Sequence, residues 1–399
     1  MPATRQPYGV GLAYRPEVHH DIMQFRQEFD VMEVATVDYL ERYWRLVQDP
    51  DTRYLRELIA TFAVVAHGIN MSIGSVEPHD DAYLHATRRF LDEYGIDEFS
   101  EHLAFHRIDG CDTRSFIAMP FEAESLNWLE RKYNAARAIL GRPFALENVS
   151  YLFVPAGCSL DEADFITEMT RRTDCSILLD ATNVFNNAHN HGYDPITYIR
   201  KLPGDRINQL HIAGGKFVNG IWLDSHSATV MEPVWDLVHA ALDHTNAQSI
   251  FLERDTGYHP FEQGIMSDIR KARDIFFKHR PATPPTAAAT TPAPTAADEA
   301  PSRAINALDP AVANLRSFQR AIMRQITDVN FRQQVAADSN LVLKDYPMTP
   351  DWKSRWEGCN QDRLKRMAIK WPETIKVQKD LEEDLKRVEW RAWAAQNSW

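Results

Sequence analysis

Histidines and carboxylates recur at the ends of short apolar runs in the first two thirds of the chain. His67 follows the run FAVVA, Asp180 ends the run SILLD, and His211 lies inside the run INQLHIA. If these runs are parallel strands, their carboxyl ends meet at one edge of the sheet, and side chains far apart in sequence converge there. Imidazoles and carboxylates in one place can bind transition metals or exchange protons. The pattern therefore predicts a metal or acid/base site.

Nine residues make up the candidate ligand set. They are His67, His102, Glu147, Asp180, Asn183, His211, Asp224, His226 and Glu253. Each has a plain structural explanation when taken alone, such as a hydrogen-bonded core histidine, or a cap for Asn183 in the case of Asp180. Together they would be costly to bury without cations. The mixture of imidazole and carboxylate suits iron, manganese or zinc better than magnesium or calcium, and a glutamate such as Glu147 can bridge two metals.

The elements that must position these groups alternate along the chain. The predicted strands are 8–14, 30–35, 62–66, 99–105, 144–146, 176–179, 207–212 and 249–252. Helical patterns follow or separate them, at a segment opened by Pro16 and at 37–47, 79–94, 123–140, 160–173, 195–202, 231–244 and 260–278. This repetition favours an α/β fold of the (β/α)8 TIM-barrel type over 1–279, rather than an open doubly wound sheet. Asp224 and His226 would then lie in the loop after the seventh strand.

The composition changes abruptly after the barrel. Residues 280–304 are rich in Pro, Ala and Thr, which cannot form a packed core, so we predict a disordered linker. Beyond it, Leu315, Phe318 and Ile322 open a stripe at helical spacing, and Leu381 and Leu385 belong to another. We therefore predict a small all-α domain over 305–399.

Charge and hydropathy exclude several functions. The 399 residues carry a formal net charge of −12 with a pI near 5.7, which argues against a general nucleic-acid or membrane-surface binder. No apolar run reaches the length of a membrane span, and no signal-peptide apolar region follows Met1. The four cysteines lack metal-binding spacing. We expect a cytoplasmic protein with reduced thiols.

Several motifs resemble one family, the multinuclear non-heme iron-dependent oxidases of the type that acts in methanobactin biosynthesis. The motifs are HGINMSIGS (67–75), SEHLAF (100–105), LENVS (146–150), LLDATNVFNNAHNHGYDP (178–195), QLHIAGG (209–215), LDSHS (223–227) and ERD (253–255). Their order and spacing agree over about residues 8–278. The resemblance implies a TIM barrel that holds two or three irons in a mixed ferrous and ferric state. It also implies that dioxygen is used to modify ribosomally made precursor peptides, usually at cysteine.

The resemblance also implies how the ligands are divided. His67, His102 and Glu147 would hold one iron. Glu147, Asp180 and His211 would surround a second iron, with Asn183 close by. We predict that Glu147, Asp180 and His211 are the catalytic groups. The third iron would be held by Asp224, His226 and Glu253. We expect Asn148, Asn190 and His191 to contact substrate near the mouth of the barrel.

Members of this family usually act with a separate partner protein that binds the leader of the peptide. We expect residues 305–399 to replace that partner or to dock it. The alternative is an unrelated helical module for oligomerisation or stability.

Other functions fit a His/Glu/Asp mouth on a barrel. A zinc endonuclease would need a basic rim, which the net charge of −12 does not favour. A divalent-metal sugar isomerase would need a lysine among the strand-end groups, for which Lys216 is the candidate. A non-catalytic, metal-stabilised peptide-binding module would bind its peptide without consuming oxygen.

Overall fold

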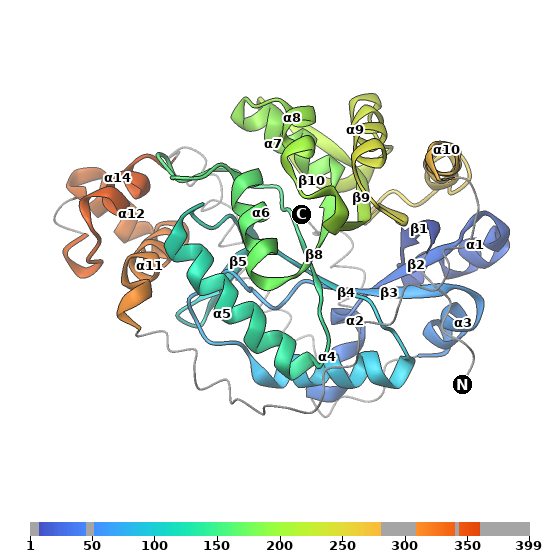
Figure 1. Cartoon of the computed structure of the whole chain (residues 1–399), viewed down its shortest axis with the longest axis horizontal. Helices are drawn as coiled ribbons and strands as arrows, with labels where there is room; N and C mark the ends of the chain where they lie inside the picture. The colour runs from blue at the N-terminus through green and yellow to red at the C-terminus, as the bar shows by residue number, and fades with distance from the viewer. Residues whose placement is uncertain (1–7, 45–51, 281–308, 340–342, 360–399) are drawn as a thin grey trace.

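The protein is a closed parallel β-barrel surrounded by helices, with a helical C-terminal region against one side (Figure 1). The computed structural model describes residues 8–44, 52–280, 309–339 and 343–359. The barrel closes at β9, because Leu210 pairs with Ile250 on one side and with Leu179 on the other. The predicted TIM barrel is thus confirmed. Residues 281–304 of the predicted linker and the stripe that includes Leu381 and Leu385 lie outside the described residues.

The eight barrel strands are short and almost wholly buried, as parallel strands covered on both faces must be. In order they are β1 (Gly9–Ala13), β2 (Val31–Ala35), β3 (Ala63–Gly68), β4 (Phe99–His102), β7 (Ala145–Glu147), β8 (Ser176–Asp180), β9 (Ile207–Val218) and β11 (Ser249–Glu253). All eight coincide with strands predicted from the sequence. The candidate ligands of β3, β4, β7, β8 and β11 stand at the carboxyl ends of these strands.

Helices cover the outside of the barrel. They are α1 (His19–Gln24), α2 (Val37–Trp44), α3 (Arg53–Thr61), α4 (Asp81–Tyr94), α5 (Ala123–Leu140), α6 (Glu162–Thr173), α7 (Ala181–His191), α8 (Pro195–Lys201), α9 (Glu232–His244) and α10 (Ile265–His279). Several begin at an aspartate whose side chain accepts a main-chain N–H of the first turn, as Asp80 does from Tyr83. The sequence prediction did not include α3 and α7.

Two β-hairpins add to the barrel and were also missing from the prediction. One consists of β5 (Phe105–Ile108) and β6 (Cys111–Ile117), directly after β4. In the other, β9 continues past the barrel and pairs with the antiparallel β10 (Ile221–Ala228). Asp224 and His226 therefore lie on a strand, and the prediction of a loop was wrong. Four consecutive residues of this strand, 224–227, are polar, so it lacks the apolar run by which the other strands were recognised.

The β9–β10 hairpin has an irregular register near the candidate ligands. Pairing shifts between Leu223 and Ala228, and His226 has a left-handed φ of 44°. A bulge of this kind bends a strand and redirects its side chains. Gly214 permits the close approach of the two strands, because a Cβ at that position would lie 1.9 Å from the carbonyl oxygen of Ala228.

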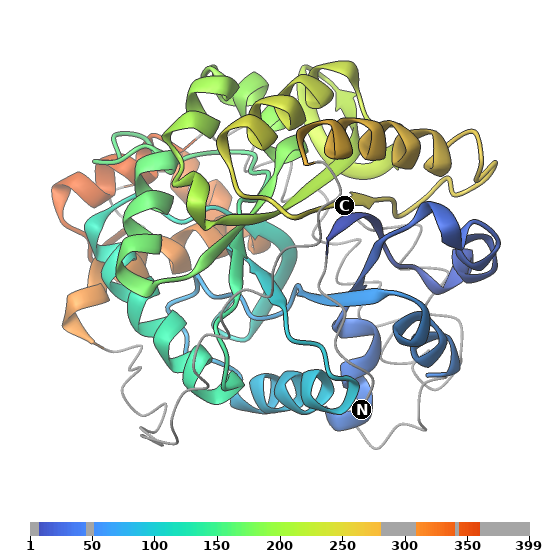
Figure 2. The ribbon, with the colours of Figure 1, turned by 45° about the vertical axis from the view of Figure 1, so that its right-hand side comes forward.

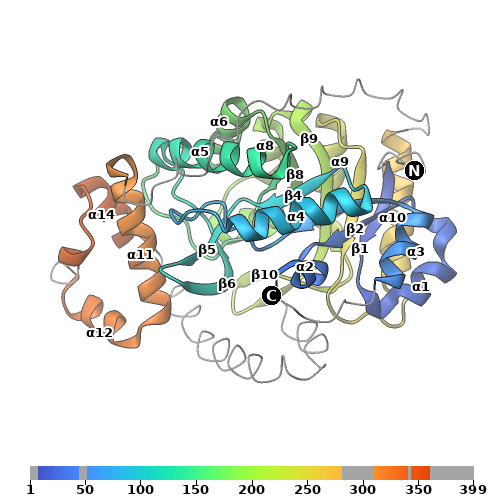
Figure 3. The same ribbon diagram turned by 90° about the horizontal axis from the view of Figure 1, so that it is seen from below.

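The C-terminal region contributes α11 (Ala313–Thr327), α12 (Val329–Ala337) and α14 (Pro350–Glu357). Figure 2 and Figure 3 show these orange and red helices beside α5 and the β5–β6 hairpin. Leu315, Phe318 and Ile322 are fully buried in α11 and join the same apolar cluster as the barrel helices. The predicted helical character is confirmed, whereas the boundaries of a separate domain over 305–399 stay a prediction. No helix among the described residues is long and apolar enough to cross a membrane.

Candidate metal centre

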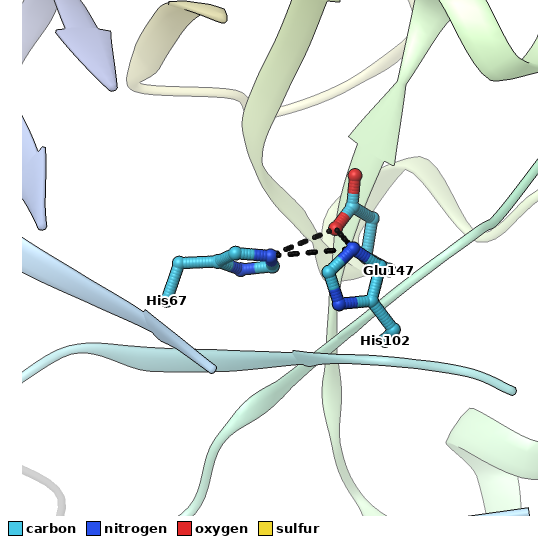
Figure 4. Close-up of side chains that lie close together, drawn as sticks. All are labelled: His67, His102 and Glu147. Atoms are coloured by element: carbon cyan, nitrogen blue, oxygen red, sulfur yellow. Dashed lines mark hydrogen bonds and ion pairs between the residues drawn. The ribbon is translucent and has the colours of Figure 1, made fainter. Parts of the chain in front are cut away.

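His67, His102 and Glu147 converge from the ends of three neighbouring strands (Figure 4). The Nε2 atoms of the two histidines lie 3.4 Å apart, and each is 3.3 Å from Oε2 of Glu147. One ligand atom from each residue lies within 4.8 Å of the others, a spacing that could hold one metal ion. The sequence placed these three residues in one set, and the structure brings them together.

A second group shares Glu147. It consists of Glu147, Asp180, His211 and Glu253, all of them buried. Nδ1 of His211 is 3.2 Å from Oε1 of Glu147 and 3.2 Å from Oε2 of Glu253. The two oxygens of Glu147 thus face different groups, which is the arrangement of a carboxylate that bridges two cations. Glu253, expected only in the third set, is also a member of this one.

Asp180 has two roles, one for each carboxylate oxygen. It is the N-cap of α7, and its Oδ1 accepts the N–H of Asn183 at 2.8 Å. Its other oxygen, Oδ2, is buried without a hydrogen-bond partner among the described residues. The structural explanation of Asp180 as a cap and the functional one as a ligand are therefore compatible. The same N-cap, together with Gly192 in the left-handed conformation after the last turn, is the sequence signal by which α7, absent from the prediction, could have been found.

The third predicted set lies beside the second one. Nε2 of His226 is 2.9 Å from Oδ1 of Asp224 and 3.6 Å from Oε2 of Glu253. Since the same Glu253 oxygen also faces His211, the second and third sets are contiguous.

Buried polar atoms without hydrogen-bond partners indicate which ligand this site could bind. Among the described residues, buried side-chain atoms without a hydrogen-bond partner include Glu147 Oε2, Asp180 Oδ2, Asn183 Oδ1, His211 Nδ1, Asp224 Oδ1 and His226 Nε2. Each such atom costs about 1–3 kcal/mol if it stays unpaired. Carboxylate and amide oxygens with imidazole nitrogens are a donor set for a first-row transition metal. The residues present therefore fit such ions.

Electrostatics support the same interpretation. Burial raises the pKa of Asp180 well above its ordinary value, and the neighbouring charges of Asp224 and Glu147 raise it further. Burial alone would lower the pKa of His211, but the carboxylates around it, with Glu253 foremost, outweigh burial and raise that pKa well above its ordinary value. Without a cation the site thus retains protons that a bound cation would displace.

Each candidate histidine also contacts a second group on the side facing away from the cluster. Nδ1 of His67 is 2.8 Å from Oγ of Ser100, and Nδ1 of His102 donates to the carbonyl of Gly68 at 3.1 Å. The ring of His102 also stacks on Phe116 of β6, with 3.9 Å between centroids.

The other two histidines face carboxylates. Nδ1 of His226 donates to Asp255 at 2.9 Å, and Nε2 of His211 donates to Glu33 at 2.9 Å. Arg15 contacts Asp255 and, against the effect of burial, lowers its pKa to about 2. Glu33 and Arg15 were not recognised from the sequence, although Glu33 is the single carboxylate within the apolar strand VMEVA.

Comparison with known proteins identifies the family. A family model described as RiPP precursor modification enzyme MbnB/TglH/ChrH matches residues 9–276. The chain belongs to this family. Its members modify ribosomally synthesised precursor peptides, so the barrel described above is that of a precursor modification enzyme.

Relatives of this precursor modification enzyme include two UPF0276 proteins of bacteria. A UPF0276 protein of Nitrosospira multiformis is 34% identical over 233 residues, which are 57% of this chain and 82% of the relative. A UPF0276 protein of Alcanivorax borkumensis is 30% identical over 274 residues, which are 66% of this chain and 89% of the relative.

Two solved structures align with this chain at low identity. The IolI protein with a bound zinc atom aligns with a TM-score of 0.43 and 13% identity, over 68% of this chain and 97% of its own. Endonuclease IV from Thermus thermophilus aligns with a TM-score of 0.43 and 14% identity, over 68% of this chain and 99% of its own.

The residues predicted to bind substrate in this precursor modification enzyme all have partners within the protein. The side chain of Asn148 pairs with the main chain of Asp180, donating to its carbonyl at 3.0 Å and accepting its N–H at 2.9 Å. Asn190 pairs in the same way with the main chain of Trp222, and His191 donates to the carbonyl of Tyr151. Asn190 and His191 stand at the opposite end of α7 from Asp180. Contact with substrate stays a prediction for all three.

Proposed function

We propose that this protein is an iron- and dioxygen-dependent oxidase that modifies a residue, cysteine by the resemblance, of a ribosomally synthesised precursor peptide. The observation that carries the proposal is the sharing of Glu147 between two buried ligand groups, in a chain that belongs to a family of precursor modification enzymes.

Two groups of side chains would each bind a metal ion. His67 and His102 would complete one position beside Glu147, and Asp180, His211 and Glu253 would complete a second. Asp224 and His226 would extend the site on the side of Glu253. Bound iron would supply the capacity to activate dioxygen and to accept electrons from the substrate.

The protein itself supplies orientation and exclusion of water. The side chain of His211 is fully buried, whereas 14% of the His102 side chain and 20% of the Asp224 side chain are exposed. A peptide side chain would therefore approach on the side of these two exposed residues. The buried side of the site keeps water away from the reacting atoms, and the fixed ligands hold the peptide side chain in one orientation.

Metal analysis of protein purified without oxygen tests the proposal. We expect more than one iron per chain, with Mössbauer signals of both ferrous and ferric ions, and oxygen consumption when a cysteine-containing precursor peptide is added. Full occupancy by zinc or manganese without iron would contradict the oxidase. Stoichiometric peptide binding without oxygen consumption would instead support the non-catalytic binding module.

The isomerase alternative requires a lysine among the strand-end groups. Its candidate, Lys216, is exposed on the extension of β9.

We also propose that the C-terminal region binds the leader of the peptide. The support is its position against the β5–β6 hairpin, whose Phe116 stacks on the candidate ligand His102. Photo-crosslinking of a leader peptide to the full chain should label residues of α11 to α14 without a second protein. Labelling confined to the barrel helices would contradict this role.

A further inference from the structure

One buried carboxylate at the candidate centre lies outside all the ligand sets. Glu33 belongs to β2, a strand that contributes none of the candidate ligands, and it is 2% exposed. Its Oε2 lies 2.9 Å from Nε2 of His211, which projects from β9. Two strands, β11 and β1, separate β9 from β2 in the sheet, so the contact crosses the interior of the barrel.

The contact determines which nitrogen of His211 carries the proton. An ionised carboxylate only accepts hydrogen bonds, so Nε2 must be the protonated nitrogen when it faces Glu33. Nδ1 faces Glu147 and Glu253, each 3.2 Å away, and is the nitrogen whose lone pair a metal ion would use once its proton is displaced. Only an unprotonated ring nitrogen can bind a metal ion, and its other nitrogen commonly donates to an oxygen in this way.

His211 has the opposite orientation to the other candidate histidines. In His67, His102 and His226, Nε2 points at the cluster and Nδ1 is hydrogen-bonded to a group outside it. In His211, Nδ1 points at the cluster and Nε2 is hydrogen-bonded to Glu33 outside it. Because its ring is fully buried, bulk solvent does not reach the outer nitrogen. The orientation of His211 therefore depends on Glu33.

We propose that Glu33 is a positioning residue that holds His211 in the Nε2-protonated form and directs its Nδ1 at the metal position formed with Glu147, Asp180 and Glu253. The proposal rests on metal binding at the proposed site, but on neither iron as the metal nor peptide oxidation. Glu33 acts through His211 and has no contact with substrate in this role.

Two substitutions test this role in the full-length chain. In Glu33→Gln the side-chain amide can donate to Nε2, which favours the other tautomer and blocks Nδ1. In Glu33→Met the outer partner of His211 is removed and the buried Nε2–H is left unpaired, so this variant is expected to lose stability as well. Glu98→Gln is the matched control, because Glu98 also accepts a hydrogen bond from a side chain of β9, that of Gln209, at 2.6 Å.

Cobalt(II) titration of the metal-stripped chains supplies the readout, with visible absorption reporting the geometry of each bound ion. We expect both Glu33 variants to lose about 10–100-fold in affinity at one metal position, with a changed absorption spectrum, while the others keep wild-type affinity. Melting of metal-free Glu33→Gln, which keeps a hydrogen-bonding group beside Nε2, should match that of Glu98→Gln when followed by circular dichroism, a result that a purely structural role would not give.

The possible failures can be told apart. Wild-type affinity and spectra in both Glu33 variants would overturn the positioning role and leave the proposed function standing. An equal loss of affinity in Glu98→Gln would also overturn it. A wild-type chain that binds no cobalt would overturn the proposed function and, with it, this inference.

Discussion

Two buried polar regions of this molecule differ in how their hydrogen bonds are satisfied. At the mouth of the barrel, Oδ2 of Asp180 and Nδ1 of His211 have no hydrogen-bond partner among the described residues. At the junction of α11 with the barrel, both the oxygen and the nitrogen of the Gln319 amide are hydrogen-bonded. The amide accepts the N–H of Val76 at 2.8 Å and donates to the carbonyl of Gly74 at 2.6 Å.

The comparison shows how to separate a ligand-binding site from a structural contact. Buried polar groups in native proteins nearly always find partners, so a paired group needs no further explanation. A group of unpaired atoms directed at one point requires a ligand. By this criterion the junction attaches the C-terminal region to the barrel, and the mouth has the features of a metal site.

The largest expected effect comes from Asp180. Asp180→Asn keeps a good N-cap for α7 but removes the charge at the metal position. We expect the metal-free variant to be at least as stable as wild type, because one of several crowded carboxylates is removed. Metal content, measured by mass spectrometry, and peptide oxidation should both be lost.

Asp180→Ala separates the two roles of this residue further. It should lose the metal equally and, because the cap is lost too, should destabilise the metal-free chain by about 1 kcal/mol. Full activity in either variant, or in His102→Ala, would contradict the assignment of the site.

The second prediction concerns a buried carboxylate that is satisfied by a proton and hydrogen bonds instead of a metal. Burial raises the pKa of Glu162 to about 8, although a hydrogen bond from Tyr151 opposes the rise. The unfolded chain ionises this group near pH 4.5. Its contribution to stability is therefore complete below pH 4.5 and is lost as the pH rises toward 8.

Chemical denaturation across this pH range checks the prediction. The free energy of unfolding of wild type should decline by up to about 1.4 kcal/mol per pH unit relative to Glu162→Gln, which cannot ionise. Parallel pH profiles of the two proteins would show that Glu162 is ionised in the folded state.

Gln319 should have a smaller effect, and on stability alone. Gln319→Ala leaves the buried N–H of Val76 and the carbonyl of Gly74 unpaired, which should cost about 1–3 kcal/mol in the free energy of unfolding. Metal stoichiometry should not change. Gln334→Ala on the exposed face of α12 is the matched control and should change stability by less than about 0.5 kcal/mol.

The smallest effect is expected at Asn190. Asn190→Ala loses both hydrogen bonds to the main chain of Trp222, at a partly buried position, and should destabilise the protein by about 0.5–1.5 kcal/mol. If Asn190 only supports the β9–β10 hairpin, the KM for precursor peptide will stay unchanged. A raised KM with unchanged metal content would support the predicted contact with substrate.

Much of the barrel could be predicted from the sequence, because buried parallel strands appear as apolar runs such as SILLD and SIFLE. The candidate ligands followed from their positions at the ends of these runs. β10 and α7 could not be recognised in the same way. One has the polar sequence LDSHSA, and the other contains NNAHNH, so tertiary contacts and caps determine their structure. The pairing of Glu33 with His211 was also beyond sequence reasoning, since it joins residues 178 positions apart across the barrel.

The shared carboxylate of Glu147 makes the two ligand groups thermodynamically linked. A cation bound beside His67 and His102 restrains the same side chain that the neighbouring group uses, so the second cation loses less conformational freedom but meets more positive charge. Whichever of these effects is larger, the coupling free energy is reciprocal, and each position changes the affinity of the other by the same factor. Loading of this centre with cations would therefore be one coupled equilibrium and not a sum of independent ones.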